Sequence, residues 1–423
     1  MRVAQFVQRY PPALGGSEAY FQRLSHHLAR HGDSVTVWTT TALDLSAFWS
    51  PAGRIAPAGE FTDGPIRVRR FPLWRMTGRR WLLKPLSLLP QRTWQALTLP
   101  CNPVSFAMRR AAGECHEPFD VVHAGAFPYA WPIVCARRLA RRLGVPFALT
   151  PFLHLGDPTD PSDPTRRQYT APPLRALLRS ADLVFVQTPS EQQAVERLGV
   201  AAERIVRHGL GVDPAECTGG DRRTARAAWG VGDADIVIGH LANNSVEKGT
   251  VDLVEAHRRI YQRGSRCMLV LAGPEMPNAR AALADADRTR VLRLGAIDEA
   301  AKRDFFAGID LFALPSRSDS FGLVLLEAWA NGVPNVVYRA GGPADLVRHG
   351  QDGLQAPCGD IEALADQLER LIRDSDLRKE YGAAGRTRVY HEFRWPDKLN
   401  QVRDALHGLV SRSRQELASA VQS

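Results

Sequence analysis

The chain has 423 residues, of which 44% are hydrophobic and 23% charged, the composition of a folded globular protein rather than a disordered one. Its net charge of +9 is uneven: residues 1–200 carry 24 Lys and Arg against 14 Asp and Glu, a net of +10, whereas the remainder carries 30 against 31. No helix-turn-helix, zinc-finger or RNP pattern accompanies this charge, which argues against a nucleic-acid partner.

Short β-rich runs alternate with helical patterns from the first residue, as in a parallel α/β fold. "RVAQFV" precedes the helical pattern "EAYFQRLSHHLARHG", and further β-rich runs are "SVTVWTT", "DVVHA", "FALTPF" and "DLVFVQT". After the polar stretch "AECTGGDRR" the alternation restarts with "DIVIGHL", "CMLVLAG", "VLRLGAI", "LFALPS" and "NVVYRA". We therefore predict two doubly wound, Rossmann-like α/β domains that face each other across a cleft, with ligands at the carboxyl ends of the strands.

The predicted domains are residues 1–212 and 213–395, followed by a C-terminal helix and tail, 396–423, that we expect to return to the first domain. Six cysteines are scattered without a CxxC pair or a spacing suited to a metal, which fits a reducing compartment. No signal peptide or membrane-spanning run is visible. We therefore expect a cytoplasmic protein, soluble or at the cytoplasmic face of the membrane.

The loop after the first predicted strand reads "RYPPALGGSEAY". Gly15 and Gly16 lie in this loop, and Ser17 and Glu18 open the next helix. Two adjacent glycines let the backbone approach a ligand closely, and a helix N-terminus attracts a phosphate or a sugar hydroxyl. The alternative is a tight βα turn, and the loop lacks the GxGxxG pattern of a dinucleotide site.

The segment 71–110 is rich in tryptophan and basic residues. Trp74, Trp81 and Trp94 alternate with a set of seven cations: Arg75, Arg79, Arg80, Lys84, Arg92, Arg109 and Arg110. Aromatic and basic residues among leucines suit contact with an anionic membrane. A helical insertion packed against its own domain is the alternative, and the sequence leaves both open.

Two histidines of the first half lie at predicted strand ends, His123 in "DVVHAGAF" and His154 in "FALTPFLHLGDP". At such a position a histidine can hydrogen-bond a substrate hydroxyl in the cleft. A structural histidine with satisfied ring nitrogens is the alternative at both positions.

The first strand of the second half leads into "GHLANNSVEKGTVDLVEA". His240 and Asn243 belong to a polar loop, and Lys248 with Gly249 introduces the following helix. A lysine beside backbone N–H groups at a helix start suits a diphosphate, although a surface lysine near a helix cap has the same pattern.

Two acids, Asp319 and Glu327, flank the apolar run in "SDSFGLVLLEAWANG". We predict a helix that ends near Asn331, with Asp319 just before it and Glu327 two turns along it. In this arrangement Glu327 could bind the ribose hydroxyls and Asp319 could bind a hydroxyl of the sugar. The N–H groups of residues 321–324 could bind a diphosphate. The alternative is an N-cap aspartate and an exposed glutamate.

Together these segments resemble a GT-B glycosyltransferase of family 4, the glycosyltransferase group 1. Such proteins join a glycine loop of the type YPPxxGGxE to a motif of the type ExFGLVLLEAxAxGxP, and here the two read "YPPALGGSE" and "DSFGLVLLEAWANGVP". "IVRHGLGVD" resembles the family's hinge, and the resemblance covers nearly the whole chain. It implies a retaining, metal-independent transfer of a hexose from a UDP- or GDP-linked sugar, without a further cofactor, to a hydroxyl of a lipid-linked or cell-surface glycan precursor.

The resemblance also implies residue roles. Asp319, His154 and Lys248 would act in catalysis, while Glu18 and His123 would contact the acceptor. The donor would be bound by Gly15, Gly16, His240, Asn243, Lys248, Asp319, Ser320, Phe321, Gly322, Leu323, Val324 and Glu327.

Two positions depart from the family pattern. Asp319 replaces the first glutamate of the long motif, and His240 stands at about the place of an arginine that usually accompanies the lysine. A neutral histidine stabilises a leaving diphosphate less than an arginine does. Two alternatives therefore stay open: a sugar-nucleotide 2-epimerase, which needs no acceptor, and a non-catalytic sugar-nucleotide-binding partner protein.

Overall fold

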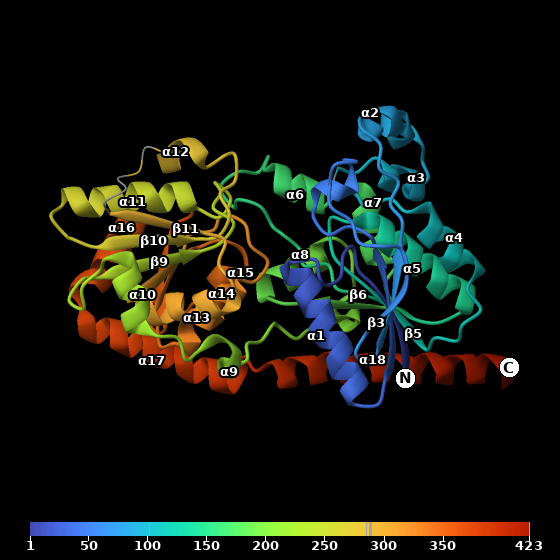
Figure 1. The fold of residues 1–423 in the computed structure, drawn as a ribbon. Helices are drawn as coiled ribbons and strands as arrows, with labels where there is room; N and C mark the ends of the chain where they lie inside the picture. The colour runs from blue at the N-terminus through green and yellow to red at the C-terminus, as the bar shows by residue number, and fades with distance from the viewer. Residues whose placement is uncertain (101, 285, 287–289, 423) are drawn as a thin grey trace.

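The structure, a computed structural model, describes residues 1–100, 102–284, 286 and 290–422. Its frame is two sheets with helices on their faces (Figure 1). The strand order is β3-β4-β2-β1-β5-β6-β7-β8 in the first sheet and β11-β10-β9-β12-β13-β14 in the second. Described neighbouring strands run parallel, apart from the antiparallel edge pair of β3 and β4. The predicted fold class, two doubly wound α/β domains, is confirmed.

The first sheet is built from residues 2–207. Its strands are β1 (Arg2–Phe6), β2 (Ser34–Thr40), β3 (Gly59–Asp63), β4 (Ile66–Phe71), β5 (Val121–Ala124), β6 (Phe147–Leu149), β7 (Leu183–Val186) and β8 (Ile205–Arg207).

Helices and 3-10 turns connect these strands. They are α1 (Gly16–Arg30), η1 (Ser46–Phe48), α2 (Arg79–Leu83), η2 (Lys84–Leu88), α3 (Arg92–Leu97), α4 (Phe106–Glu114), α5 (Ala130–Leu143), α6 (Pro164–Tyr169), α7 (Pro172–Arg179), α8 (Pro189–Arg197) and η3 (Ala202–Arg204).

The second sheet is built from residues 237–356. Its strands are β9 (Val237–Leu241), β10 (Met268–Ala272), β11 (Val291–Gly295), β12 (Leu311–Leu314), β13 (Asn335–Tyr338) and β14 (Gly353–Ala356). The accompanying helices are α9 (Pro214–Cys217), α10 (Arg222–Trp229), α11 (Thr250–Gln262), α12 (Arg280–Ala284), α13 (Glu299–Gly308), α14 (Leu323–Ala330), α15 (Gly341–Leu346), α16 (Ile361–Arg373) and α17 (Ser375–Glu392).

The central strands lack the alternation of a half-exposed sheet because helices cover both faces. Strands β5, β7, β12 and β13 are buried at every position. Parallel strands that share this order place their carboxyl ends at one edge of each sheet. The loops after β1, β5, β6, β9 and β12 are therefore candidates to carry a site.

The last helix, α18 (Trp395–Gln422), runs below the half of the molecule that carries the first sheet in Figure 1, whereas α17 lies below the other half. Helix α18 is bonded to the half that carries the first sheet: Arg403 Nε donates to Asp33 Oδ2 at 2.7 Å, and Arg414 Nη2 donates to Asp120 Oδ1 at 2.9 Å. These bonds hold the end of the chain against its beginning. The domain boundaries at residues 212 and 395 stay predictions.

Two further predictions concern the chain as a whole. The five cysteines within the described residues are free, and Cys101 lies outside those residues. Along the described part of the chain, no helix has both the length and the apolar character needed to cross a membrane. The cytoplasmic location stays a prediction.

Candidate functional site

A cavity of about 560 Å³ lies between the half of the chain that carries the first sheet and the half that carries the second. We call it the interdomain cavity. Its walls are the loops that follow β1, β5 and β6 on one side and β9 and β12 on the other. This is the expected place for a ligand in parallel α/β sheets. The predicted residues that line it are Gly15, Gly16, Glu18, His154, Asn243, Lys248, Asp319, Ser320, Phe321, Gly322, Leu323 and Val324. His123, His240 and Glu327 are not part of this lining.

An ion pair joins the two loops of the second half inside the cavity. Lys248 Nζ donates to Asp319 Oδ2 at 2.6 Å, and the two side chains are only 23% and 15% exposed. Burial raises the pKa of Asp319, but the Lys248 ammonium outweighs it and the pKa lies below its usual range. Asp319 is therefore an ionised carboxylate, and the pair places a cation and an anion side by side in the cleft.

The backbone around Gly249 brings these two side chains together. Gly249 has φ 71°, and a Cβ on it would lie 1.8 Å from the carbonyl oxygen of Pro315, at the end of β12. Only glycine fits such an approach. The Lys248 loop is also bonded to the β12 loop, since Arg317 N donates to Glu247 O at 2.9 Å. The spacing of the two motifs is thus fixed by backbone contact.

His154 reaches the same pair from the first half of the chain. Its ring lies 4.9 Å from the ring of Tyr169, and it interacts electrostatically with Lys248 and Asp319. Burial, reinforced by Lys248, lowers the pKa of His154 to about 4. The imidazole is therefore neutral at neutral pH. The structure thus brings the three predicted catalytic side chains together across the cleft.

The glycine loop is shaped by Glu18. This carboxylate is 2% exposed and accepts hydrogen bonds from Arg9 Nε at 2.7 Å and Gln8 Nε2 at 3.0 Å. A Cβ on Gly15 would lie 2.3 Å from Glu18 Oε2, so the position needs glycine for space. Gly16 has no atom near its missing Cβ. Glu18 therefore organises the wall of the cavity while also facing it.

His240 lies beneath the Lys248 loop, not at the cavity surface where the sequence suggested it. It is fully buried, with Nδ1 2.8 Å from Ala313 O and Nε2 3.0 Å from Thr250 Oγ1. Because a carbonyl only accepts, Nδ1 carries the proton and Nε2 accepts from Thr250. Both ring nitrogens are used, so His240 supports the loop from below.

Glu327 lies outside the cavity lining on helix α14. Its Oε1 accepts from Lys302 Nζ at 2.8 Å, and burial raises its pKa despite this cation. Leu323, which does line the cavity, precedes Glu327 by four residues, so both are on the same face of the helix. Glu327 is thus one helical turn from the cavity.

His123 is embedded in the first sheet. It is fully buried, its Nε2 lies 2.8 Å from Thr150 Oγ1, and its ring packs against Phe21 and Phe185. Burial lowers its pKa to about 3, so it is a neutral core residue. The structure does not bring His123 to the acceptor side of the cleft.

The start of helix α14 faces the cavity, as predicted. Gly322 precedes the helix with φ 91°, and the N–H groups of Leu323 and Val324 belong to its first turn, where they have no intrahelical partner. The N–H of Phe321 differs, because it donates to Asp319 Oδ1 at 3.1 Å. The amides suited to an anion are therefore those of residues 323 and 324.

Sequence reasoning missed two features near the site. Arg317 bridges the halves, with Nη1 3.0 Å from Asp157 Oδ2 and Nη2 2.6 Å from Asp252 Oδ2. Phe152, in the cavity wall, has φ 50°, which is a strained conformation for a bulky residue. No rule of sequence spacing predicts a contact between Arg317 and Asp157, and no residue pattern predicts a positive φ at a phenylalanine.

Comparison with known families shows two matches that together cover most of the chain. Residues 221–388 match the family described as "Glycosyl transferases group 1", and residues 15–211 match the "Glycosyl transferase 4-like domain".

Curated relatives differ in what their names say they act on. The chain is 28% identical over 299 residues to N-acetyl-alpha-D-glucosaminyl L-malate synthase of Bacillus anthracis, covering 70% of this chain and 76% of the relative. It is 26% identical over 424 residues to D-inositol 3-phosphate glycosyltransferase of Pseudarthrobacter chlorophenolicus, covering 96% and 93%.

Solved structures share the fold. Sucrose-phosphate synthase of Thermosynechococcus elongatus superposes with a TM-score of 0.75 at 21% identity, over 97% of this chain and 99% of that one. Anabaena HepE, solved with UDP and glucose, superposes with a TM-score of 0.69 at 19% identity, over 96% and 100%.

Proposed function

Because the chain belongs to the group 1 glycosyl transferases, family 4, whose members are retaining, metal-independent hexosyltransferases, we propose that the cavity binds a UDP- or GDP-linked hexose at Lys248, Asp319 and the start of α14. The enzyme transfers a sugar from a nucleotide sugar. The observation that supports the proposed site best is the Lys248–Asp319 pair, 2.6 Å apart, at the carboxyl ends of β9 and β12 with His154 opposite.

In the proposed complex, Lys248 and the N–H groups of Leu323 and Val324 hold the diphosphate. The sugar C1–O bond to the diphosphate breaks, and charge on the departing group is stabilised by these fixed donors. The acceptor hydroxyl bonds to C1 from the same face, and its proton passes to the diphosphate. When the diphosphate binds Lys248, the ion pair between Lys248 and Asp319 breaks. Asp319 then accepts a hydrogen bond from a sugar hydroxyl.

The remaining predicted residues have supporting parts in this proposal. Neutral His154 hydrogen-bonds the sugar from the first half, and Glu327 reaches the ribose at the rim of the cavity. Glu18 faces the acceptor, and Gly15 and Gly16 let the backbone approach the donor. His240 acts through the Lys248 loop and is a positioning residue.

The test of the donor class is a titration followed by turnover. UDP and GDP are titrated calorimetrically, and UDP-glucose, UDP-N-acetylglucosamine and GDP-mannose are then assayed for nucleoside diphosphate release with cell-envelope lipids as acceptor. We expect one nucleotide to bind at one site per chain and its sugar to be transferred with retention at C1. Binding of neither nucleotide would contradict the proposed site.

We further propose that the acceptor is presented at a membrane surface. In the segment that follows β4, Trp81, Leu82 and Leu88 are 64%, 65% and 86% exposed, and Lys84 Nζ lies 5.9 Å from the Trp81 ring. Aromatic and aliphatic side chains beside cations suit the interface of an anionic bilayer.

The basic residues of this segment are not equivalent. Arg79 is 5% exposed, and its guanidinium donates to Trp74 O at 2.7 Å and to Asn102 O at 2.6 Å, so it is a structural residue rather than a surface cation. The side chain of Arg80 lies outside the described residues. The membrane test therefore uses the exposed apolar side chains.

The variant Trp81→Ser/Leu82→Ser/Leu88→Ser should lose most of its co-sedimentation with vesicles of phosphatidylcholine and phosphatidylglycerol, because each buried apolar side chain contributes about 1.5–3 kcal/mol. Tyr390→Ser, at an exposed aromatic residue of α17, is the matched control. UDP and GDP affinity should be unchanged in both. Equal vesicle binding by the triple variant and the wild type would end the membrane proposal.

A further inference from the structure

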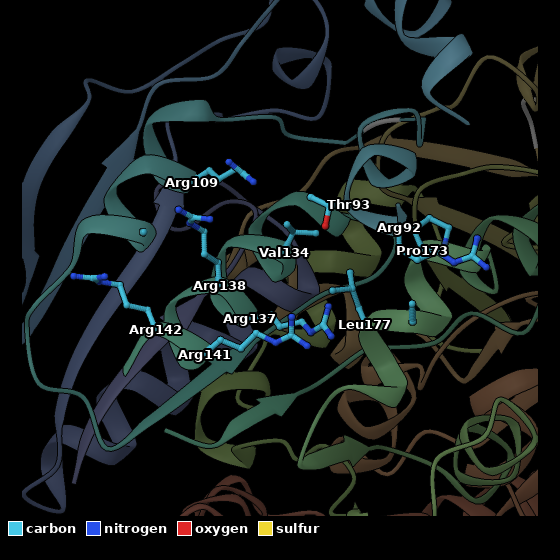
Figure 2. Close-up of a pocket in the computed structure, with 12 residues that line it drawn as sticks. Arg92, Thr93, Arg109, Val134, Arg137, Arg138, Arg141, Arg142, Pro173 and Leu177 are labelled. Carbon is cyan, nitrogen blue, oxygen red and sulfur yellow. The ribbon is translucent and has the colours of Figure 1, made fainter. Parts of the chain in front are cut away.

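A second cavity, of about 500 Å³, opens on the first half of the chain and is lined by six arginines (Figure 2). They come from three helices: Arg92 from α3, Arg109 from α4, and Arg137, Arg138, Arg141 and Arg142 from α5. The other lining residues are Thr93, Gly113, Val134, Pro173, Ala176 and Leu177, so this set of described residues contains no carboxylate. We call this site the arginine pocket.

The arginine pocket is separate from the interdomain cavity. Tyr129, which lines that cavity, immediately precedes α5, whereas Arg141 lies twelve residues further along the helix. At 1.5 Å per residue the separation is about 18 Å. Val134, the α5 residue of the pocket nearest to Tyr129, lies about 8 Å from it along the helix, so the two cavities share no lining residue and the four α5 arginines occupy the second half of α5.

The placement of the arginines on α5 works against helix stability. Arg137 and Arg141 are four residues apart, as are Arg138 and Arg142, and like charges at this spacing destabilise a helix. Burial, reinforced by neighbouring Arg141, lowers the pKa of half-buried Arg137. Arg141 and Arg142 lie in the last turn, where the helix dipole favours cations, but Arg137 precedes that turn.

The protein itself supplies few partners for these cations. Arg142 Nε donates to Cys115 O at 3.0 Å and its Nη2 lies 3.1 Å from His116 Nε2, and Arg92 Nη1 donates to Gln95 Oε1 at 2.6 Å. Within the described part of the chain, none of the six arginines forms an ion pair with an aspartate or a glutamate. A cluster of guanidinium groups that lacks carboxylate partners can bind an anionic ligand, because the ligand supplies the missing negative charge.

The geometry of two of these side chains suits a phosphate. The guanidinium of Arg138 lies over α4, 2.4–2.8 Å from where a Cβ on Gly113 would be, so the glycine makes room for it. Arg109 precedes Gly113 by one turn on the same helix face, and Figure 2 shows the Arg138 side chain extended toward the helix that carries Arg109. Paired guanidinium forks match the oxygens of a phosphate group.

We propose that the arginine pocket binds a phosphate-bearing ligand with at least two negative charges, at a site separate from the interdomain cavity and independent of the function proposed above. Val134, Pro173 and Leu177 form an apolar part of the wall for the organic group attached to the phosphate. Such a phosphate can come from a soluble diphosphate or phosphate ester, or from a lipid headgroup with a terminal phosphate.

The test uses Arg137→Gln/Arg141→Gln, which removes two charges and keeps residues of high helix propensity. Its matched control is Arg223→Gln/Arg370→Gln, the same change at exposed arginines of α10 and α16. Pyrophosphate is titrated calorimetrically into both variants in a Lys248→Ala background, so that the interdomain cavity contributes little. We expect the pocket variant to bind pyrophosphate about tenfold more weakly or worse, because it loses charge-assisted hydrogen bonds, and the control to be unchanged.

Vesicles distinguish the two sources of phosphate. Selective loss of binding to phosphatidylcholine vesicles that contain phosphatidic acid would identify a lipid headgroup, while loss of pyrophosphate binding alone would identify a soluble ligand. Relief of like-charge repulsion should leave the pocket variant at least as thermostable as the wild type without phosphate. Arg109→Gln, on a different helix, should weaken binding in the same direction. Unchanged affinity for both probes in the two pocket variants would overturn the proposal.

Discussion

Lys248→Ala should slow sugar transfer by about 10²–10³-fold, the cost of removing one fixed donor from a developing anion. It should also weaken binding of UDP or GDP by about 1.5–3 kcal/mol, as expected for a charged hydrogen bond. The cavity lining contains two permanent cations among its described residues, Arg9 and Lys248, and Arg9 is already bonded to Glu18. Lys248 is itself paired with Asp319, but it lies beside the start of α14, so we expect it to be the cation that the leaving diphosphate takes from its present partner.

A second variant separates two causes of the Lys248→Ala defect. Without the lysine, Asp319 remains as a nearly buried carboxylate that repels a diphosphate. Lys248→Ala/Asp319→Asn removes this repulsion, so it should recover part of the nucleotide affinity but not the transfer rate. Lys379→Ala, which removes an exposed lysine paired with Asp376 on α17, is the matched control. Wild-type affinity and rate in a folded Lys248→Ala protein would exclude Lys248 from the site.

The alternation of strands and helices could be predicted because buried parallel strands appear as short apolar runs. The hairpin of β3 and β4 was not predicted. Strand β3 is an edge strand with exposed and half-exposed residues, so it lacks the apolar signal of the central strands. Pattern reasoning therefore recovered the interior of each sheet better than its edge.

The site could be predicted where a loop follows a strand, because topology decides where such loops meet. Lys248 and Asp319 are 71 residues apart in the sequence, yet both follow neighbouring strands β9 and β12. Their direct contact was not foreseen, since it depends on the backbone packing of Gly249 against Pro315.

Burial was the property that the sequence could not supply. His123, His240 and Arg79 all had plausible surface or ligand-binding interpretations, and the structure buries all three. Each is instead bonded to a hydroxyl or a carbonyl group of its own chain. A polar residue at a strand end has the same pattern in either situation, because its neighbours in space come from distant segments.

The two acids of the long motif should respond differently to neutral replacement. Asp319→Asn frees Lys248 from its ion pair, so affinity for free UDP or GDP should be unchanged or higher, whereas transfer should slow by about ten- to a hundredfold through loss of a charged hydrogen bond to the sugar. Glu327→Gln should weaken nucleotide binding by about 1.5–3 kcal/mol if this side chain holds the ribose. Calorimetry and the transfer assay measure the two effects separately.

Lys302→Gln is the control that makes the Glu327 result interpretable. It breaks the same 2.8 Å ion pair from the other side, while leaving the Glu327 carboxylate in place. If Glu327 contacts the ribose, only Glu327→Gln loses nucleotide affinity; if the ion pair merely supports helix α14, both variants lose it alike. Because burial already raises the pKa of Glu327 and the Lys302 ammonium is the main influence that lowers it, Lys302→Gln should raise that pKa further. As the pH falls, nucleotide binding by Lys302→Gln should therefore begin to weaken at a higher pH than binding by the wild type, a shift that follows only if the ionised carboxylate is the form that binds.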